Sequence, residues 1–173
     1  ALMALQITTM LAAALLATTV YRLVAHFHGR RVGATAGLAA VVATPLGFWA
    51  SIPKRHVLTA AVVVVVLYCF AVSRSDASRR GHLTRATAYA SVGFLTTIHP
   101  FEAFFVFAVF APLDLLTAPT HSVRSLGVVG AVFALSLIPF FLINTAISGH
   151  PLQSPRFLSG YGSGIDIPTD IGG

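Results

Sequence analysis

Charged residues are scarce in this sequence. Only 9% of the 173 residues are Asp, Glu, Lys or Arg, and 56% are hydrophobic. Soluble globular domains carry roughly 25% charged residues. Although the length alone would suit one soluble domain, this composition excludes that class and predicts an integral membrane protein.

Cysteine and the common catalytic motifs are also scarce. The single cysteine, Cys69, lies within an apolar run, so it can form no intrachain disulfide. The sequence contains no GxxxxGK[ST], HExxH, CxxC or GxSxG motif, which disfavours an ATPase, a zinc metalloprotease or a serine hydrolase within this stretch. We therefore predict no cofactor and no metal site, with a divalent metal left as an open alternative.

Long apolar runs fill most of the chain instead. A bilayer core about 30 Å thick needs about 20 apolar residues in a helix. Even the β-branched run 62–66 is expected to be helical, because lipid offers no partner to an unpaired backbone group. The predicted fold class is all-α, a polytopic bundle of about six transmembrane helices. The expected spans are 1–25, 32–50, 57–73, 86–98, 101–118 and 125–145. They lie within a transmembrane domain of residues 1–147. Residues 148–173 are expected to form an extracytoplasmic loop or the start of a next segment.

The apolar region 86–118 is too long for one upright span. One helix over this range would be about 50 Å long, against a core of about 30 Å. The region is interrupted by His99-Pro100-Phe101-Glu102, and proline disfavours helical geometry at the residue before it. We expect a short Pro-broken helical hairpin with a polar tip; a single tilted span stays the alternative.

Arginine placement predicts the orientation of the bundle. If the hairpin is present, eight of the 11 basic residues share one side: Arg22, Arg30, Arg31, Arg74, Arg79, Arg80, Arg85 and Arg124. Lys54, Arg55 and Arg156 fall on the other side. Because cytoplasmic loops are enriched in Lys and Arg, the first side is predicted to face inward in a multi-pass protein of the plasma membrane. The net charge of +6 then reflects topology, and no nucleic-acid partner is expected.

Polar residues converge on the predicted outer side. Lys54, Arg55 and His56 form a cationic cluster suited to a phosphate group; an interfacial anchor whose side chains reach toward water is the alternative. Glu102, beside His99, lies in a long apolar region, where a carboxylate costs roughly 2–3 kcal/mol at the membrane centre. It either contacts a polar substrate or metal, or begins a helix at a wet tip, where negative charge is favoured. 

Asp114 lies near the end of the second hairpin helix. We interpret it as an interfacial or helix-packing residue rather than a catalytic one.

The end of the last span resembles a motif of a known family. Pro139, Asn144 and Gly149-His150-Pro151, followed by Tyr161, are similar to the "PF…N…G.P…Y" region of the polytopic glycosyltransferases of the C superfamily, which are protein-mannosyltransferase-like. Two further segments are similar to that family's helices and run in the same order: 30–46 and 89–102.

The resemblance implies transfer of a sugar from a polyprenyl-phosphate donor to a protein, lipid or glycan acceptor at the outer membrane face. It implies cationic groups on the phosphate and a carboxylate as the base. The base of the family precedes a helix equivalent to residues 1–25, so the catalytic residue is expected upstream of Ala1 and stays unknown. The candidate substrate and lipid-phosphate site consists of Lys54, Arg55, His56, His99, Glu102 and Arg156.

Two other classes stay open. A transporter or permease also uses broken helices with polar tips, and a non-catalytic membrane subunit needs no site at all. The chain itself is expected to be a piece of a longer protein, because a full hydrophobic segment begins at Ala1. An acidic residue in a preceding outer loop would favour the enzyme, whereas two matching sets of spans would favour the transporter.

Overall fold

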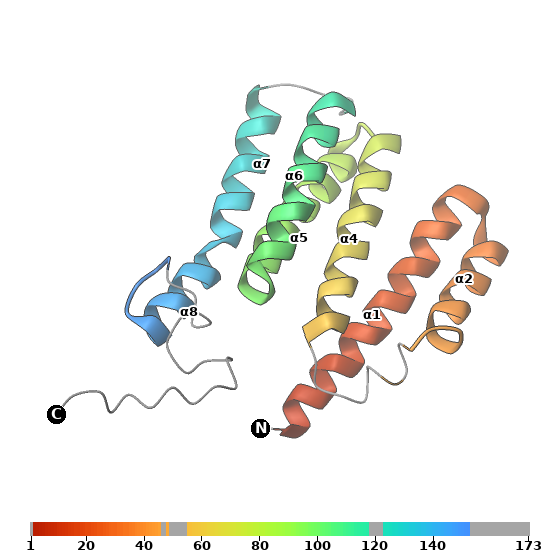
Figure 1. The fold of residues 1–173 in the computed structure, drawn as a ribbon. Coiled ribbons are helices and arrows are strands. Elements are labelled where there is room, and N and C mark those ends of the chain that lie inside the picture. Colours follow the sequence, from red (N-terminus) through yellow and green to blue (C-terminus); the bar gives the residue numbers. More distant parts are fainter. Residues whose placement is uncertain (1, 46–47, 49–54, 118–122, 153–173) are drawn as a thin grey trace.

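The computed structural model describes residues 2–45, 48, 55–117 and 123–152, and within these ranges the chain is helical without strands. The helices from α1 to α7 alternate in direction along the chain, and α8 continues beyond the end of α7 (Figure 1). They are α1 (Leu2–His28), α2 (Arg30–Val42), α4 (Arg55–Ser75), α5 (Arg79–Ile98), α6 (Pro100–Thr117), α7 (Val123–Ser136) and α8 (Ile138–Ser148). The predicted all-α bundle is confirmed.

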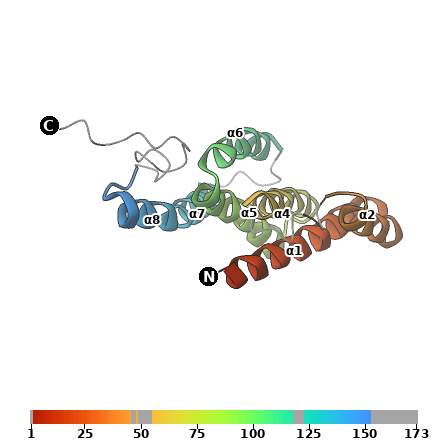
Figure 2. The same ribbon diagram turned by 60° about the horizontal axis from the view of Figure 1, so that its bottom comes forward.

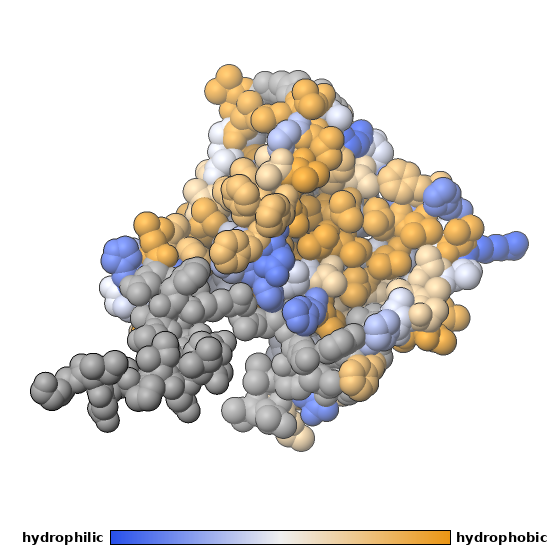
Figure 3. All heavy atoms as spheres, in the orientation of Figure 1, coloured by the Kyte–Doolittle hydropathy of each residue, from blue (hydrophilic) through white to orange (hydrophobic). Residues whose placement is uncertain are grey.

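Four helical segments are long and apolar enough to cross a membrane: Gln6–His28, His56–Ser75, Pro100–Thr117 and Val123–Ser148. Many large hydrophobic side chains on them are exposed, among them Leu11, Phe104 and Leu142. Among the described residues, hydrophobic ones cover most of the face shown in Figure 3. Such a surface is stable against lipid rather than water, so this is a membrane protein.

Helix α5 is as long as a span but carries Arg79, Arg80 and Arg85. It is also the central helix, since it packs against α4, α6, α7 and α8. Neighbouring helices form the row α2, α1, α4, α5 and α7, with α6 on one face of the row (Figure 2). The most polar long helix is thus the one that its neighbours cover.

The predicted hairpin is confirmed at its tip, because α5 ends at Ile98 and α6 begins at Pro100. Proline suits the first turn of a helix, where its missing N–H has no intrahelical partner to lose. The first hairpin helix is longer than the expected 86–98. It begins at Arg79, where the Ser78 hydroxyl accepts a hydrogen bond from the Arg80 N–H at 3.2 Å. Hydropathy detected only the apolar part of this helix.

Two other boundaries also differ from expectation. The structure describes the expected span 32–50 continuously up to residue 45, and in this part the helix ends at Val42. Pro45 contributes to this end, because proline disfavours helical geometry at the preceding residue, Thr44. The expected span 125–145 is divided at Leu137 into α7 and α8. Pro139 causes this break, since its ring clashes with the carbonyl four residues earlier and it has no N–H to donate.

Glycine allows α1 and α2 to approach each other closely. Gly33 and Gly37 of α2 are buried against α1, and a Cβ atom at Gly33 would lie 2.7 Å from the Ala25 Cβ. Any larger side chain would push the two helices apart. Small residues of this kind bring helix backbones together in membranes, where van der Waals contact drives association.

The alternating directions give the bundle two distinct ends. The turns α1/α2 and α4/α5 and the start of α7 lie together at one end, which we call the arginine end (Figure 1). The eight arginines of the predicted inner side lie in the halves of their helices nearest to it. The other end, which we call the histidine end, holds the start of α4, the α5/α6 tip and the end of α8 (Figure 1).

Candidate functional site

Three of the predicted site residues meet at the histidine end. The rings of His56, in the first turn of α4, and His99, at the α5/α6 tip, are stacked with centroids 5.9 Å apart and an interplanar angle of 27°. The Nδ1 atom of His99 lies 2.9 Å from the Glu102 Oε1. Antiparallel packing of α4 and α5 causes this convergence, since it sets the start of one helix beside the end of the other.

These three residues differ in exposure. His99 is buried, whereas His56 is exposed and the Glu102 side chain is 48% exposed. Glu102 also stands in the first turn of α6, where the helix dipole favours a negative charge. His99 therefore lies against an accessible carboxylate, and a polar ligand could reach both Glu102 and His56.

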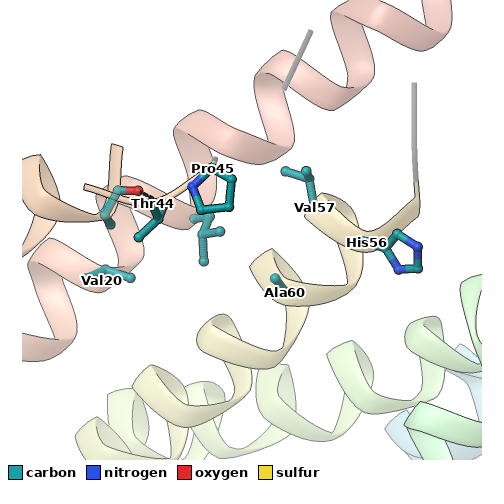
Figure 4. A pocket seen from close by; sticks show the side chains of 8 residues that line it. Val20, Thr44, Pro45, His56, Val57 and Ala60 are labelled. Atoms are coloured by element: carbon teal, nitrogen blue, oxygen red, sulfur yellow. Dashed lines mark hydrogen bonds between the residues drawn. The ribbon is translucent and has the colours of Figure 1, made fainter. Parts of the chain in front are cut away.

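An apolar cleft lies beside this polar group (Figure 4). Its volume is about 540 Å³, and it lies between α1, the end of α2 and the start of α4. The lining residues are Leu16, Val20, Ala40, Thr44, Pro45, His56, Val57 and Ala60. The volume is within the roughly 300–1,000 Å³ typical of small-molecule sites. His56 is among the residues that line the cleft, but its ring points away from Val20 and Pro45 (Figure 4) and stacks on the ring of His99, so the polar group lies beside the cleft.

The remaining predicted site residues are outside what the structure describes. Arg55 is the first residue of α4, but its side chain is among the parts left undescribed, as are the whole of Lys54 and Arg156. Phosphate binding by these three cations stays a prediction. Of the expected outer segment 148–173, the described part ends at Leu152.

The Pro139–Pro151 motif forms a local structure at the end of α8. Pro139 stands at the start of this helix, and Gly149 ends it in a left-handed conformation with φ of 74°, which glycine adopts readily. The buried Asn144 amide donates a hydrogen bond to the Pro151 carbonyl at 3.1 Å. The motif therefore folds the chain back on itself after the helix.

The largest polar cluster of the described helices lies toward the arginine end and was not predicted from the sequence. Asp114 of α6 is fully buried. Its Oδ2 accepts hydrogen bonds from the Arg85 Nε and Nη2 at 2.8 and 2.5 Å and from the Tyr89 hydroxyl at 2.9 Å. Its Oδ1 contacts the Arg74 Nη2. We call Arg74, Arg85, Tyr89 and Asp114 the buried cluster.

The buried cluster joins α4, α5 and α6, and the Arg85 Nη1 extends it to α7 by donating to the Ser125 hydroxyl at 3.0 Å. The packing role expected of Asp114 is confirmed, and its interaction with arginine is new. The sequence did contain a signal for this ion pair, because an arginine and an aspartate in neighbouring membrane helices normally pair with each other. That signal does not identify which of the eight arginines of the inner side is involved.

Within the described ranges, no group of three or more His, Cys, Asp or Glu side chains is placed to hold a metal ion. No protein-family model, no curated protein and no solved structure matches this chain.

Proposed function

We propose that this chain is part of an integral membrane glycosyltransferase. The enzyme would take a sugar from a polyprenyl-phosphate donor at the outer face of the plasma membrane and transfer it to a protein, lipid or glycan acceptor. The observation that carries the proposal is the position of the His56–His99–Glu102 group beside the apolar cleft at the histidine end.

The chemistry of such a donor fits this arrangement. A polyprenyl-phosphate sugar has a long apolar chain, an anionic phosphate and a polar sugar. The cleft lined by residues such as Leu16, Val20 and Ala60 suits the apolar chain, because burial of hydrocarbon surface stabilises binding by about 25 cal/mol per Å². His56 stands where the apolar lining ends, and the exposed carboxylate of Glu102 suits sugar hydroxyls, which donate hydrogen bonds to it.

Phosphate binding is assigned to the start of α4. Lys54 and Arg55 directly precede His56 in the sequence, and guanidinium groups bind phosphate oxygens through paired N–H donors. During transfer, an acceptor oxygen bonds to the anomeric carbon while the bond from that carbon to the phosphate oxygen breaks. The phosphate leaves with the electron pair, and a base takes the proton of the acceptor. Cations at the phosphate stabilise the charge that develops on the leaving group.

The acidic residues of the described helices favour this proposal over a transporter. Ion-coupled transporters place their sites near the middle of the membrane. Asp114 is instead held by two arginines, and Glu102 lies at the α5/α6 tip. Neither carboxylate has the position expected of a coupling site.

The test uses the full-length protein in proteoliposomes with a polyprenyl-phosphate-linked sugar, and it measures release of the polyprenyl phosphate. We expect Arg55→Ala to slow release at unchanged folded yield. Ala60→Leu fills the cleft and should weaken use of a long-chain donor more than use of a short, water-soluble one. Ala108→Leu adds the same bulk on an exposed face of α6 and serves as the matched control. Unchanged turnover of the long-chain donor in Ala60→Leu would remove the cleft from the donor site.

A further inference from the structure

The two arginines of the buried cluster use their guanidinium groups differently. Arg85 is 3% exposed, and it directs Nε and Nη2 at Asp114 and Nη1 at Ser125. Arg74 contacts Asp114 through Nη2, and its side chain is 17% exposed. Its Nε and Nη1 are buried and have no hydrogen-bond partner among the described residues. Buried donors normally have a partner, so these two atoms point to a bound group that accepts their hydrogen bonds.

The Arg74 guanidinium is also held in one orientation. Its central carbon lies 4.3 Å from the centroid of the Phe70 ring, a geometry in which the ring face attracts the cation. Phe70 is in turn packed against Phe110 of α6, with centroids 5.4 Å apart. A planar donor group that is fixed on two sides is preorganised for a ligand that accepts two parallel hydrogen bonds.

The charge of the buried cluster favours an anion. Two guanidinium groups share the carboxylate of Asp114, which leaves one positive charge over. Buried charge is costly unless it is compensated. A phosphate oxyanion has the geometry that binds a guanidinium through paired N–H donors.

The position of Arg74 favours a phosphate that belongs to a lipid. Arg74 is the next-to-last residue of α4, at the end of an apolar stretch of spanning length. At the same end, Leu115 and Leu116 of α6 are 50% and 80% exposed. A ligand at Arg74 would thus have its phosphate at the level of the headgroups and apolar side chains close by. Basic pockets between helices on the cytoplasmic side bind anionic headgroups.

We propose that Arg74, oriented by Asp114 and Phe70, binds the phosphate of an anionic phospholipid at the arginine end of the bundle. This site is distinct from the proposed donor site at the histidine end, and it does not depend on glycosyl transfer. Bound lipid would neutralise the buried cluster and stabilise the packing of α4 on α6.

The test measures how strongly spin-labelled phosphatidylglycerol is preferred over spin-labelled phosphatidylcholine by the full-length protein in bilayers. We expect Arg74→Gln to lower this preference about fivefold, the effect of one cation near the membrane surface. Arg124→Gln removes one exposed arginine from the same end and is the matched control, with a smaller expected loss. Equal losses in the two variants would mean diffuse attraction to the surface and would overturn the site.

Two further measurements distinguish a specific contact with lipid from a loss of folding and from the binding of free phosphate. Arg74→Lys keeps the charge beside Asp114 but lacks paired donors, so we expect a folded protein with an intermediate preference. A wild-type preference in Arg74→Lys would overturn the paired-donor contact, even if Arg74→Gln failed to fold. Millimolar inorganic phosphate should leave the lipid preference unchanged, whereas its loss would assign the site to free phosphate and overturn the phospholipid proposal.

Discussion

The two ends of the bundle treat their polar groups in opposite ways. At the arginine end, Asp114 and Arg85 are buried, and three hydrogen bonds of 2.5–2.9 Å reach one carboxylate oxygen from Arg85 and Tyr89. At the histidine end, His56 and Glu102 are exposed beside an apolar cleft. Buried, paired charges fix how helices pack, whereas exposed charges beside a cleft are available to a ligand. The buried cluster therefore fixes helix packing at the first end, and the exposed group at the second end is where we propose that the substrate binds.

An all-or-none test asks whether the two ends face opposite sides of the membrane. We expect Ser78→Cys, at the arginine end, to react only with a reagent from the inner side. Ser148→Cys should react only from the outer side, together with cysteines introduced at Ser51 and Ser154. The parent chain is the control, because its Cys69 is buried. Reaction of Ser78→Cys and Ser148→Cys from the same side would contradict the two-ended arrangement.

The largest energetic contrast between the ends should come from their carboxylates. Asp114→Asn leaves two arginines without their counter-charge, and loss of one member of a buried ion pair costs about 3–5 kcal/mol. Glu102→Gln at the histidine end should cost no more than about 1 kcal/mol, as is usual for an exposed pair. The free energy of unfolding in mixed detergent micelles checks both values. Similar losses in the two variants would remove the distinction between an architectural end and a binding end.

A smaller loss is expected from Tyr89→Phe, which deletes only the hydroxyl that donates to Asp114 at 2.9 Å. Hydrogen bonds to charged groups contribute about 1.5–3 kcal/mol, so this variant should fall between Asp114→Asn and Glu102→Gln in the same unfolding measurement. Tyr68→Phe, also in the middle of the bundle on α4 and partly buried, is a matched control with the same atomic change. A loss in Tyr89→Phe no greater than in the control would show that the hydroxyl adds nothing to the buried cluster.

The positions of the helices could be predicted from the sequence, whereas the contacts between helices that distinguish the two ends could not. The span 57–73 and the break at His99-Pro100 follow from hydropathy and from the stereochemistry of proline, which are local properties. The start of α5 at Arg79 was missed because its first turn is polar and is stabilised by a Ser78 cap. The arginine partners of Asp114 and the cleft at Pro45 arise where separate helices meet. No local pattern in one helix encodes such a meeting.

The smallest expected effect concerns the turn between α4 and α5 at the arginine end. The Asp76 Oδ1 accepts a hydrogen bond from the Ser78 N–H at 2.8 Å, and hydrogen bonding to Ser78 holds the pKa of the exposed Asp76 carboxyl below its ordinary value of 3.8. A carboxyl whose pKa is lower in the folded state stabilises that state above the ordinary pKa, and this contribution is lost as the pH falls through the folded value. Asp76→Asn should therefore be slightly less stable than the parent chain at neutral pH. The difference should shrink below about pH 4 and vanish only when the pH is below the folded pKa of Asp76. Unfolding measured across this range checks the sign. A difference that persisted in acid would mean that Asp76 acts through its shape, and that charge at this end matters only within the buried cluster.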